Sequence, residues 1–82
     1  MERELIELAD RLTRINAELR DVVVTLEKVG RGLPKSSTRG RIYMMVAQLS
    51  TTTSHIDGVI KALWSVVKEM RGGGKSGKRR RV

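Results

Sequence analysis

The sequence predicts an all-α protein, an antiparallel hairpin of two long amphipathic helices with a basic C-terminal tail. Apolar residues recur at alternating intervals of three and four along residues 2–30 and again along residues 38–71, the spacing of one helix face. A short segment that contains Pro34 separates the two stretches. The 82 residues allow one domain with a single core.

The first helix is expected over about residues 2–30. Its apolar positions form an unbroken a/d heptad pattern: Leu5, Leu8, Leu12, Ile15, Leu19, Val22, Leu26 and Val29. Charged residues lie between them, and Glu7 and Arg11 have the favourable i,i+4 spacing. Gly30 and Gly32 are C-cap candidates, and Pro34 prevents the helix from continuing.

The second helix is expected over about residues 38–71, after a basic loop of residues 31–38. The same alternation is formed by Ile42, Met45, Leu49, Thr52, Ile56, Val59, Leu63, Val66 and Met70. Val46, Ile60 and Val67 widen the stripe by one row, and so broad a face suits a bundle of several helices. Ser36, Ser37 or Thr38 can act as N-cap, and glycines 72–74 end the helix. The short connection predicts antiparallel neighbours rather than one interrupted rod.

The net charge of +8 is concentrated in two segments. Residues 31–41 contain four bases and no acid, and residues 71–82 contain six bases and no acid, whereas residues 42–70 are neutral overall. A surface that is basic only for solubility would spread this charge along the helices. Segments of one sign favour polyanions, so we expect phosphate contacts from these residues: Arg71, Lys75, Lys78, Arg79, Arg80, Arg81, Arg31, Lys35, Arg39 and Arg41.

A homo-oligomer is also expected, because a lone hairpin of this composition buries little apolar surface against the ordering entropy of its chain. Tyr43 and Trp64 lie off the a/d pattern and three heptads apart, hence on one side of the second helix. Aromatic anchors are favoured in subunit contacts. The expected oligomer interface consists of Tyr43, Met44, Val46, Ile60, Trp64 and Val67.

The residue types needed for catalysis are sparse. The chain has no cysteine, and His55 is its single histidine, so neither a thiolate metal site nor a triad is expected. The sequence Gly74-Lys75-Ser76 is similar to the end of a P-loop, but Glu69 stands where that motif needs glycine. We therefore expect no enzyme, no cofactor and no small-molecule substrate.

The N-terminal residues are charged and lack the apolar region of a signal peptide. Apolar runs reach about five residues, against the ~20 that a membrane span needs. The expected place of action is a virion or the cytoplasm, in association with a nucleoid.

These features predict a structural protein that assembles with copies of itself and packages nucleic acid, double-stranded DNA first of all, without reading its sequence. In helix layout, Arg- and Val-rich composition and a basic end, the whole chain resembles the small α-helical coat and nucleocapsid proteins of rod-shaped and filamentous archaeal viruses. That resemblance implies a virion protein whose basic residues face the genome. Two other interpretations are a coiled-coil adaptor with a basic targeting tail and a protein bound to anionic membrane surfaces.

Overall fold

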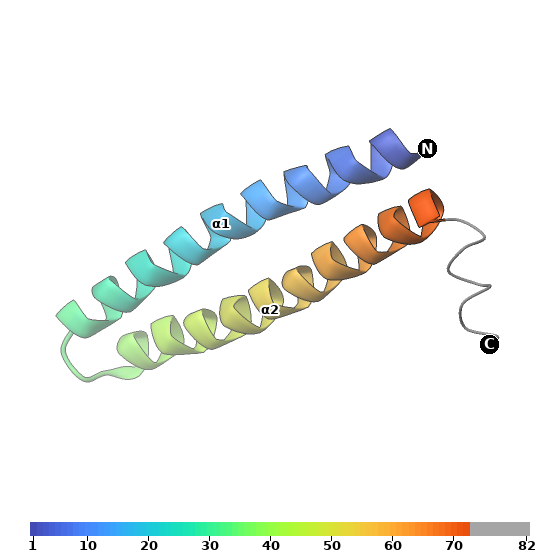
Figure 1. Ribbon diagram of the computed structural model, residues 1–82. Helices are drawn as coiled ribbons and strands as arrows, with labels where there is room; N and C mark the ends of the chain where they lie inside the picture. Colours follow the sequence, from blue (N-terminus) through green and yellow to red (C-terminus); the bar gives the residue numbers. More distant parts are fainter. Residues whose placement is uncertain (73–82) are drawn as a thin grey trace.

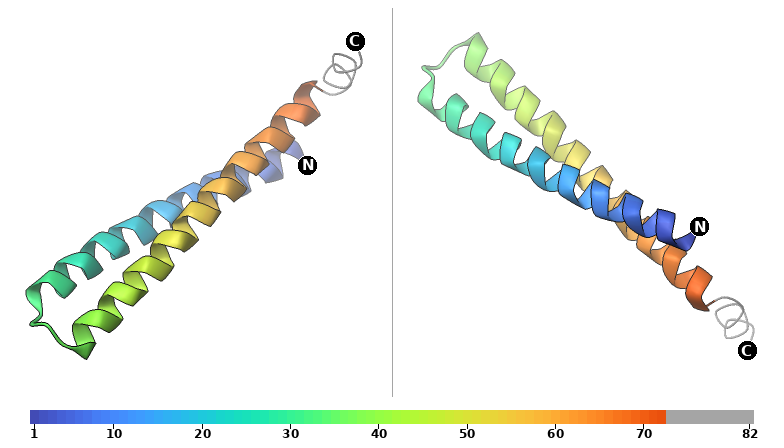
Figure 2. Two further views of the ribbon diagram at one scale, coloured as in Figure 1. Left: turned by 90° about the horizontal axis from the view of Figure 1, so that it is seen from below. Right: turned by 90° about the horizontal axis from the view of Figure 1, so that it is seen from above.

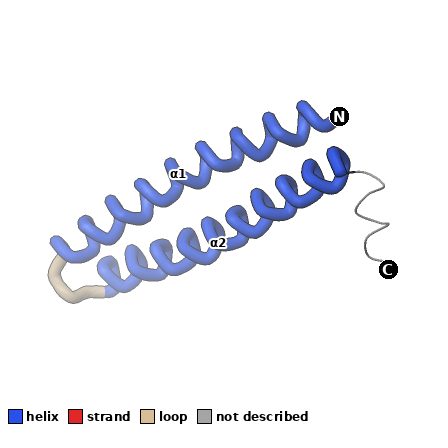
Figure 3. Tube along the Cα trace, viewed as in Figure 1, coloured by secondary structure: helices blue, strands red, loops and turns tan. Residues whose placement is uncertain are grey.

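The computed structural model describes residues 1–72, and residues 73–82 lie outside the described part. Within residues 1–72 it contains two helices, α1 (Glu2–Gly32) and α2 (Ser37–Gly72), and no strand. The helices run antiparallel from the short loop at one end, with residues 1 and 72 at the other (Figures 1 and 3). They cross at a shallow angle (Figure 2). The predicted all-α hairpin is therefore confirmed.

α1 continues through both glycines that the sequence suggested as caps. It ends where Leu33 takes an extended backbone, with φ −90° and ψ 149°, and the Leu33 N–H donates to the Gly30 carbonyl at 3.2 Å. A residue before proline is disfavoured in the helical conformation, so Pro34 ends the helix.

α2 begins at a side-chain cap. The hydroxyl of Ser36 accepts a hydrogen bond from the Arg39 N–H at 3.3 Å, and the Ser36 carbonyl accepts one from the Gly40 N–H at 3.1 Å. Ser36 is therefore the N-cap among the three candidates.

Each helix presents three adjacent rows of residues at heptad spacing, and the three rows differ in burial. The middle row is half-buried and consists of Leu5, Leu12, Leu19 and Leu26 on α1 with Ile42, Leu49, Ile56 and Leu63 on α2. The inner row is buried or half-buried and consists of Ala9, Asn16, Val23 and Gly30 with Arg39, Val46, Thr53, Ile60 and Val67. The outer row is exposed and consists of Leu8, Ile15, Val22 and Val29 with Met45, Thr52, Val59 and Val66.

The sequence-based assignment of the seam was therefore right for the middle row and wrong for the outer row. The helices pack through the middle and inner rows instead. On α1 the inner row contains Ala9 and Gly30, which are small enough for the two backbones to approach closely. This close approach leaves Ala9 fully buried and Val67 only 1% exposed.

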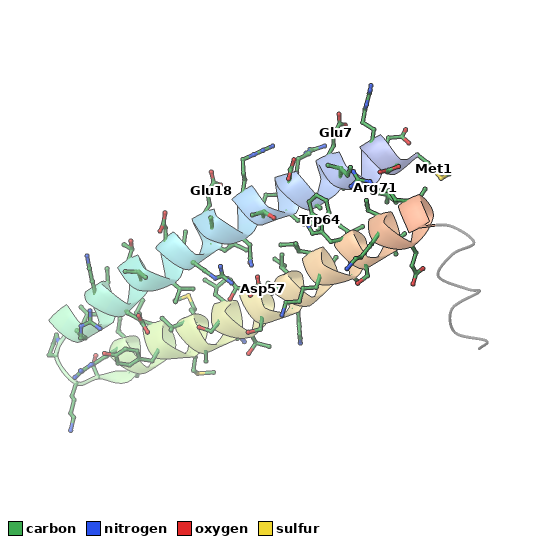
Figure 4. The ribbon with its side chains drawn as sticks, in the orientation of Figure 1. Met1, Glu7, Glu18, Asp57, Trp64 and Arg71 are labelled. Carbon is green, nitrogen blue, oxygen red and sulfur yellow. The ribbon has the colours of Figure 1, made fainter. Side chains whose placement is uncertain are left out.

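A polar cluster occupies the centre of this seam. The side-chain amide of Asn16, which is buried, donates to the Thr53 carbonyl at 3.2 Å and to Asp57 Oδ1 at 2.9 Å. Arg20 donates to the other carboxylate oxygen of Asp57, which lies between the helices (Figure 4). A buried polar group bonds well in one alignment only, so this cluster fixes the register of the hairpin.

The loop end is fixed by a second contact. A Cβ added to Gly30 would lie 3.1 Å from Tyr43 Cε1 and 3.3 Å from Ile42 Cγ2. The Tyr43 ring therefore lies close against the α1 backbone, and this close approach favours glycine at position 30.

Candidate functional site

The four loop cations gather at the closed end of the hairpin. Arg31 lies in the last turn of α1 and Lys35 in the loop, while Arg39 and Arg41 lie in the first turns of α2. The ion pairs of residues 1–72 involve none of these four cations. Their charge is consequently available to an outside anion, close to the N-terminal dipole of α2.

Arg39 is held by Tyr43 rather than by an acid. Its guanidinium lies 5.5 Å from the centroid of the Tyr43 ring, in a cation–π contact, and its Nη2 donates to the Tyr43 hydroxyl at 3.5 Å. Lys35, Ser36, Arg39, Gly40 and Tyr43 line a shallow open groove of about 310 Å³ at this end. Arg39 thus has a structural role in addition to its charge.

The cations of the predicted tail are mostly beyond the described residues. Arg71 belongs to the last turn of α2, where it forms an ion pair with Glu2 at the start of α1 (Figure 4). Lys75, Lys78, Arg79, Arg80 and Arg81 lie outside residues 1–72. Arg71 therefore helps to close the open end of the hairpin.

The residues expected at an oligomer interface are divided by the structure between three places. Val46 and Val67 are buried in the seam and Ile60 is half-buried there, so these three lie inside the hairpin and not on its outer surface. Tyr43 rests on Gly30 but remains 36% exposed, and Trp64 is 41% exposed on α2. Met44 is 64% exposed on α2.

The main exposed apolar surface is the outer row, which heptad spacing alone assigns to the seam. On α1, Leu8, Ile15, Val22 and Val29 are each 46–47% exposed, and on α2, Met45, Val59 and Val66 are 42–49% exposed. The signal that could have identified it is the size of the competing residues, because three of the four residues in the seven-residue repeat Ala9, Asn16, Val23 and Gly30 are smaller than their neighbours in the aliphatic row.

The two outer rows lie on one face of the hairpin. Arg20 and Asp57 each follow a middle-row residue by one position. Their ion pair shows that the row of α1 that contains Arg20 and the row of α2 that contains Asp57 lie on the same face of the hairpin. In an antiparallel pair, rows that are the same number of positions from the seam lie on the same side. Each outer-row residue follows a middle-row residue by three positions, so the two outer rows share the opposite face of the hairpin. We call this surface the outer-row face.

The metal-ligating side chains of residues 1–72 are scattered. No group of three or more His, Cys, Asp or Glu side chains among residues 1–72 could hold a metal ion, and His55 is exposed on α2. Within the same residues, neither helix has an apolar stretch sufficient to cross a membrane.

Comparison with protein families, with curated proteins and with solved structures finds no significant match.

Proposed function

We propose that this chain is a structural, self-assembling protein that packages nucleic acid through sequence-independent phosphate contacts, in the manner of a coat, nucleocapsid or nucleoid protein. The observation that supports this proposal is the separation of charge. The helix surfaces mix both signs, whereas the loop end has four cations without an acidic partner and five more follow Gly72 in the sequence.

Such cations suit a phosphate backbone rather than base edges. Arg31, Lys35 and Arg41 are exposed. The segment after Gly72 is rich in glycine, which imposes no shape of its own. Contacts of this kind neutralise phosphates in any base sequence and release counterions, so binding depends strongly on salt. Arginine also matches the fork geometry of phosphate oxygens.

Salt-dependent binding to duplex DNA tests the proposal. Five phosphate contacts from residues 75–81 give a log–log salt slope of roughly −4.5, at about −0.9 per contact. Deletion of residues 75–82 should remove this contribution to the salt slope, and Arg31→Gln, Lys35→Gln and Arg41→Gln together should remove much of the slope that remains. Arg39 is left in place because it supports Tyr43.

A matched control is the pair Lys61→Gln and Lys68→Gln, which removes two exposed cations from the body of α2. This variant should bind DNA with a nearly unchanged slope. If the truncated chain binds with the affinity and salt dependence of the full chain, the tail is not a nucleic-acid arm, and the adaptor interpretation replaces this one.

A further inference from the structure

We propose that the outer-row face is covered by the same face of a second copy of this chain. The product is a two-fold four-helix bundle with the two loops at opposite ends, and its axis runs perpendicular to the helices and passes beside both Ile15 and Val59. This inference rests on the self-assembly part of the proposed function and names its interface.

The burial pattern leaves the bundle half complete. Among residues 1–72 only Ala9, Val46 and Val67 are buried apolar side chains. Three apolar rows per helix are the pattern of a helix that contacts two neighbours, as in a four-helix bundle, and the hairpin supplies one neighbour. The second copy supplies the other.

The available area matches a stable dimer. The principal extents of 61 × 26 × 13 Å describe a slab one helix thick. An overlap of roughly 40 Å along two helices that together are about 20 Å wide gives about 800 Å² per partner, the size of a standard specific interface.

The register of the hairpin determines which residues of α1 and α2 lie at the same height along the helices. Glu2 pairs with Arg71, Asn16 with Asp57, and Gly30 packs against Tyr43. Ile15 therefore lies level with Gly58 and Val59, so one axis perpendicular to the helices can pass by both outer-row residues. A shallow hollow of about 260 Å³ beside Ile15, lined by Arg11, Arg14, Ile15 and Glu18, receives a side chain of the second copy.

Charges at the rim select this register. On α1, the row that flanks the outer row on the side away from the middle row consists of Glu4, Arg11 and Glu18. With the axis at Ile15, Arg11 faces the partner's Glu18 and Glu18 faces the partner's Arg11. A shift of one heptad in one direction sets Glu18 against the partner's Glu18, and a shift in the other sets Arg11 against the partner's Arg11. Neither Arg11 nor Glu18 has an ion pair within residues 1–72.

The rim charges also decide between the two ways of stacking the hairpins. With both loops at one end, Glu4 would face the partner's Glu69, and the loop cations of the two copies would be adjacent. With the loops at opposite ends, Val29 meets the partner's Met1, whose side chain is 85% exposed in the hairpin. The N-terminal acids of one copy then approach the basic loop of the other.

This arrangement also brings the two cationic segments together. The end of α2 in one copy, Gly72, lies at the pole formed by the loop of the other copy. Each pole of the dimer thus combines four loop cations with the point from which the remaining five cations follow in the sequence. In a single hairpin the loop and Gly72 lie at opposite ends (Figure 1).

Single-cysteine crosslinking of the full chain tests the arrangement, and the absence of native cysteine makes the background clean. Under mild oxidation without nucleic acid, Ile15→Cys and Val59→Cys should each form a disulfide-linked dimer, because each residue meets its own copy at the axis. Leu8→Cys should crosslink with Val22→Cys in a mixture and only weakly with itself. Val24→Cys, exposed away from the outer-row face, is the control and should remain monomeric.

Three results would overturn the proposal. Efficient mixed crosslinks between Ile15→Cys and Val59→Cys, without self-crosslinks, would mean that the loops share one end. Equal crosslinking of Val24→Cys would mean random collision. Monomeric chains that bind anionic phospholipid vesicles would mean that the face contacts lipid.

A charge reversal checks the register without touching an apolar residue. Arg11→Glu should weaken dimerisation about tenfold, since two attractive contacts become repulsive. Arg11→Glu with Glu18→Arg should restore it, whereas Arg3→Glu, away from the rim, should leave it unchanged. If the double variant stays as weak as the single one, the proposed register is wrong. DNA binding is measured in a separate experiment. Failure of the proposed DNA binding can therefore be distinguished from failure of the proposed dimer interface.

Discussion

On α1 the inner row has smaller side chains than the outer row at three of four heptad positions, whereas on α2 the two rows are similar in composition. The buried row on α1 contains Ala9, Asn16 and Gly30, and the exposed row beside it contains Leu8, Ile15 and Val29. Hydrophobicity alone would bury the second set. The difference teaches that close backbone approach and a polar cluster hold the hairpin in register, while its larger aliphatic side chains remain for a second contact.

The strongest test of this contrast uses neighbouring valines. Val67 is in the inner row and Val66 in the outer row. Val67→Ala should lower the free energy of unfolding by about 2 kcal/mol, through lost burial and a cavity, with no direct effect on dimerisation. Val66→Ala should instead weaken the dimer, so its effect on the denaturation midpoint should depend on protein concentration. Denaturant titrations at two protein concentrations distinguish the two variants. If both midpoints depend on protein concentration in the same way, the inner and outer rows do not have different roles.

The close approach at the loop end can be tested at two glycines. Gly30→Leu should cost about 1–3 kcal/mol because the new side chain overlaps the Tyr43 ring and Ile42. Gly32→Leu is the matched control, since nothing lies within 4 Å of a Cβ at that position. Thermal melts followed by circular dichroism measure both, and equal losses would mean that the Gly30 contact does not matter.

The polar cluster of Asn16, Asp57 and Arg20 can be tested as the determinant of the hairpin's register. Asp57→Ala leaves the buried amide of Asn16 without one acceptor and should cost about 1–2 kcal/mol. Asp21→Ala, at an exposed position, should have almost no effect. Asn16→Leu should retain or increase stability but broaden the amide resonances of the hairpin, because an apolar seam tolerates several alignments. Sharp, single resonances in this variant would show that the register is set elsewhere.

The smallest effect is expected at the open end. Arg71→Gln removes the exposed ion pair with Glu2 and should lower stability by less than about 1 kcal/mol, and only at low salt. Melts at low and high ionic strength should converge for this variant and the unaltered chain. A large loss that persists in salt would mean that the pair is part of the fold's core.

The heptad spacing was sufficient to predict two helices, their antiparallel pairing and the role of Pro34. It could not choose the seam, because Leu8 and Ala9, or Val66 and Val67, belong to adjacent rows and spacing alone ranks them equally. The choice depends on how closely two backbones approach, which is a property of the pair. Likewise, Gly30 reads as a helix end in isolation, whereas in the hairpin it lies within α1 and under the Tyr43 ring. The loop cations were predicted from charge alone, whereas the contact of Arg39 with Tyr43 depends on the turn of α2.

Sedimentation equilibrium of the full chain at micromolar concentration, without nucleic acid, measures whether the outer-row face is paired. We expect a species of 18.4 kDa, twice the 9.2 kDa of one chain. This species should dissociate on dilution, with a loss of helix signal. A 9.2 kDa monomer that melts cooperatively at the same temperature at every concentration would contradict it, because the outer-row face would then need no partner.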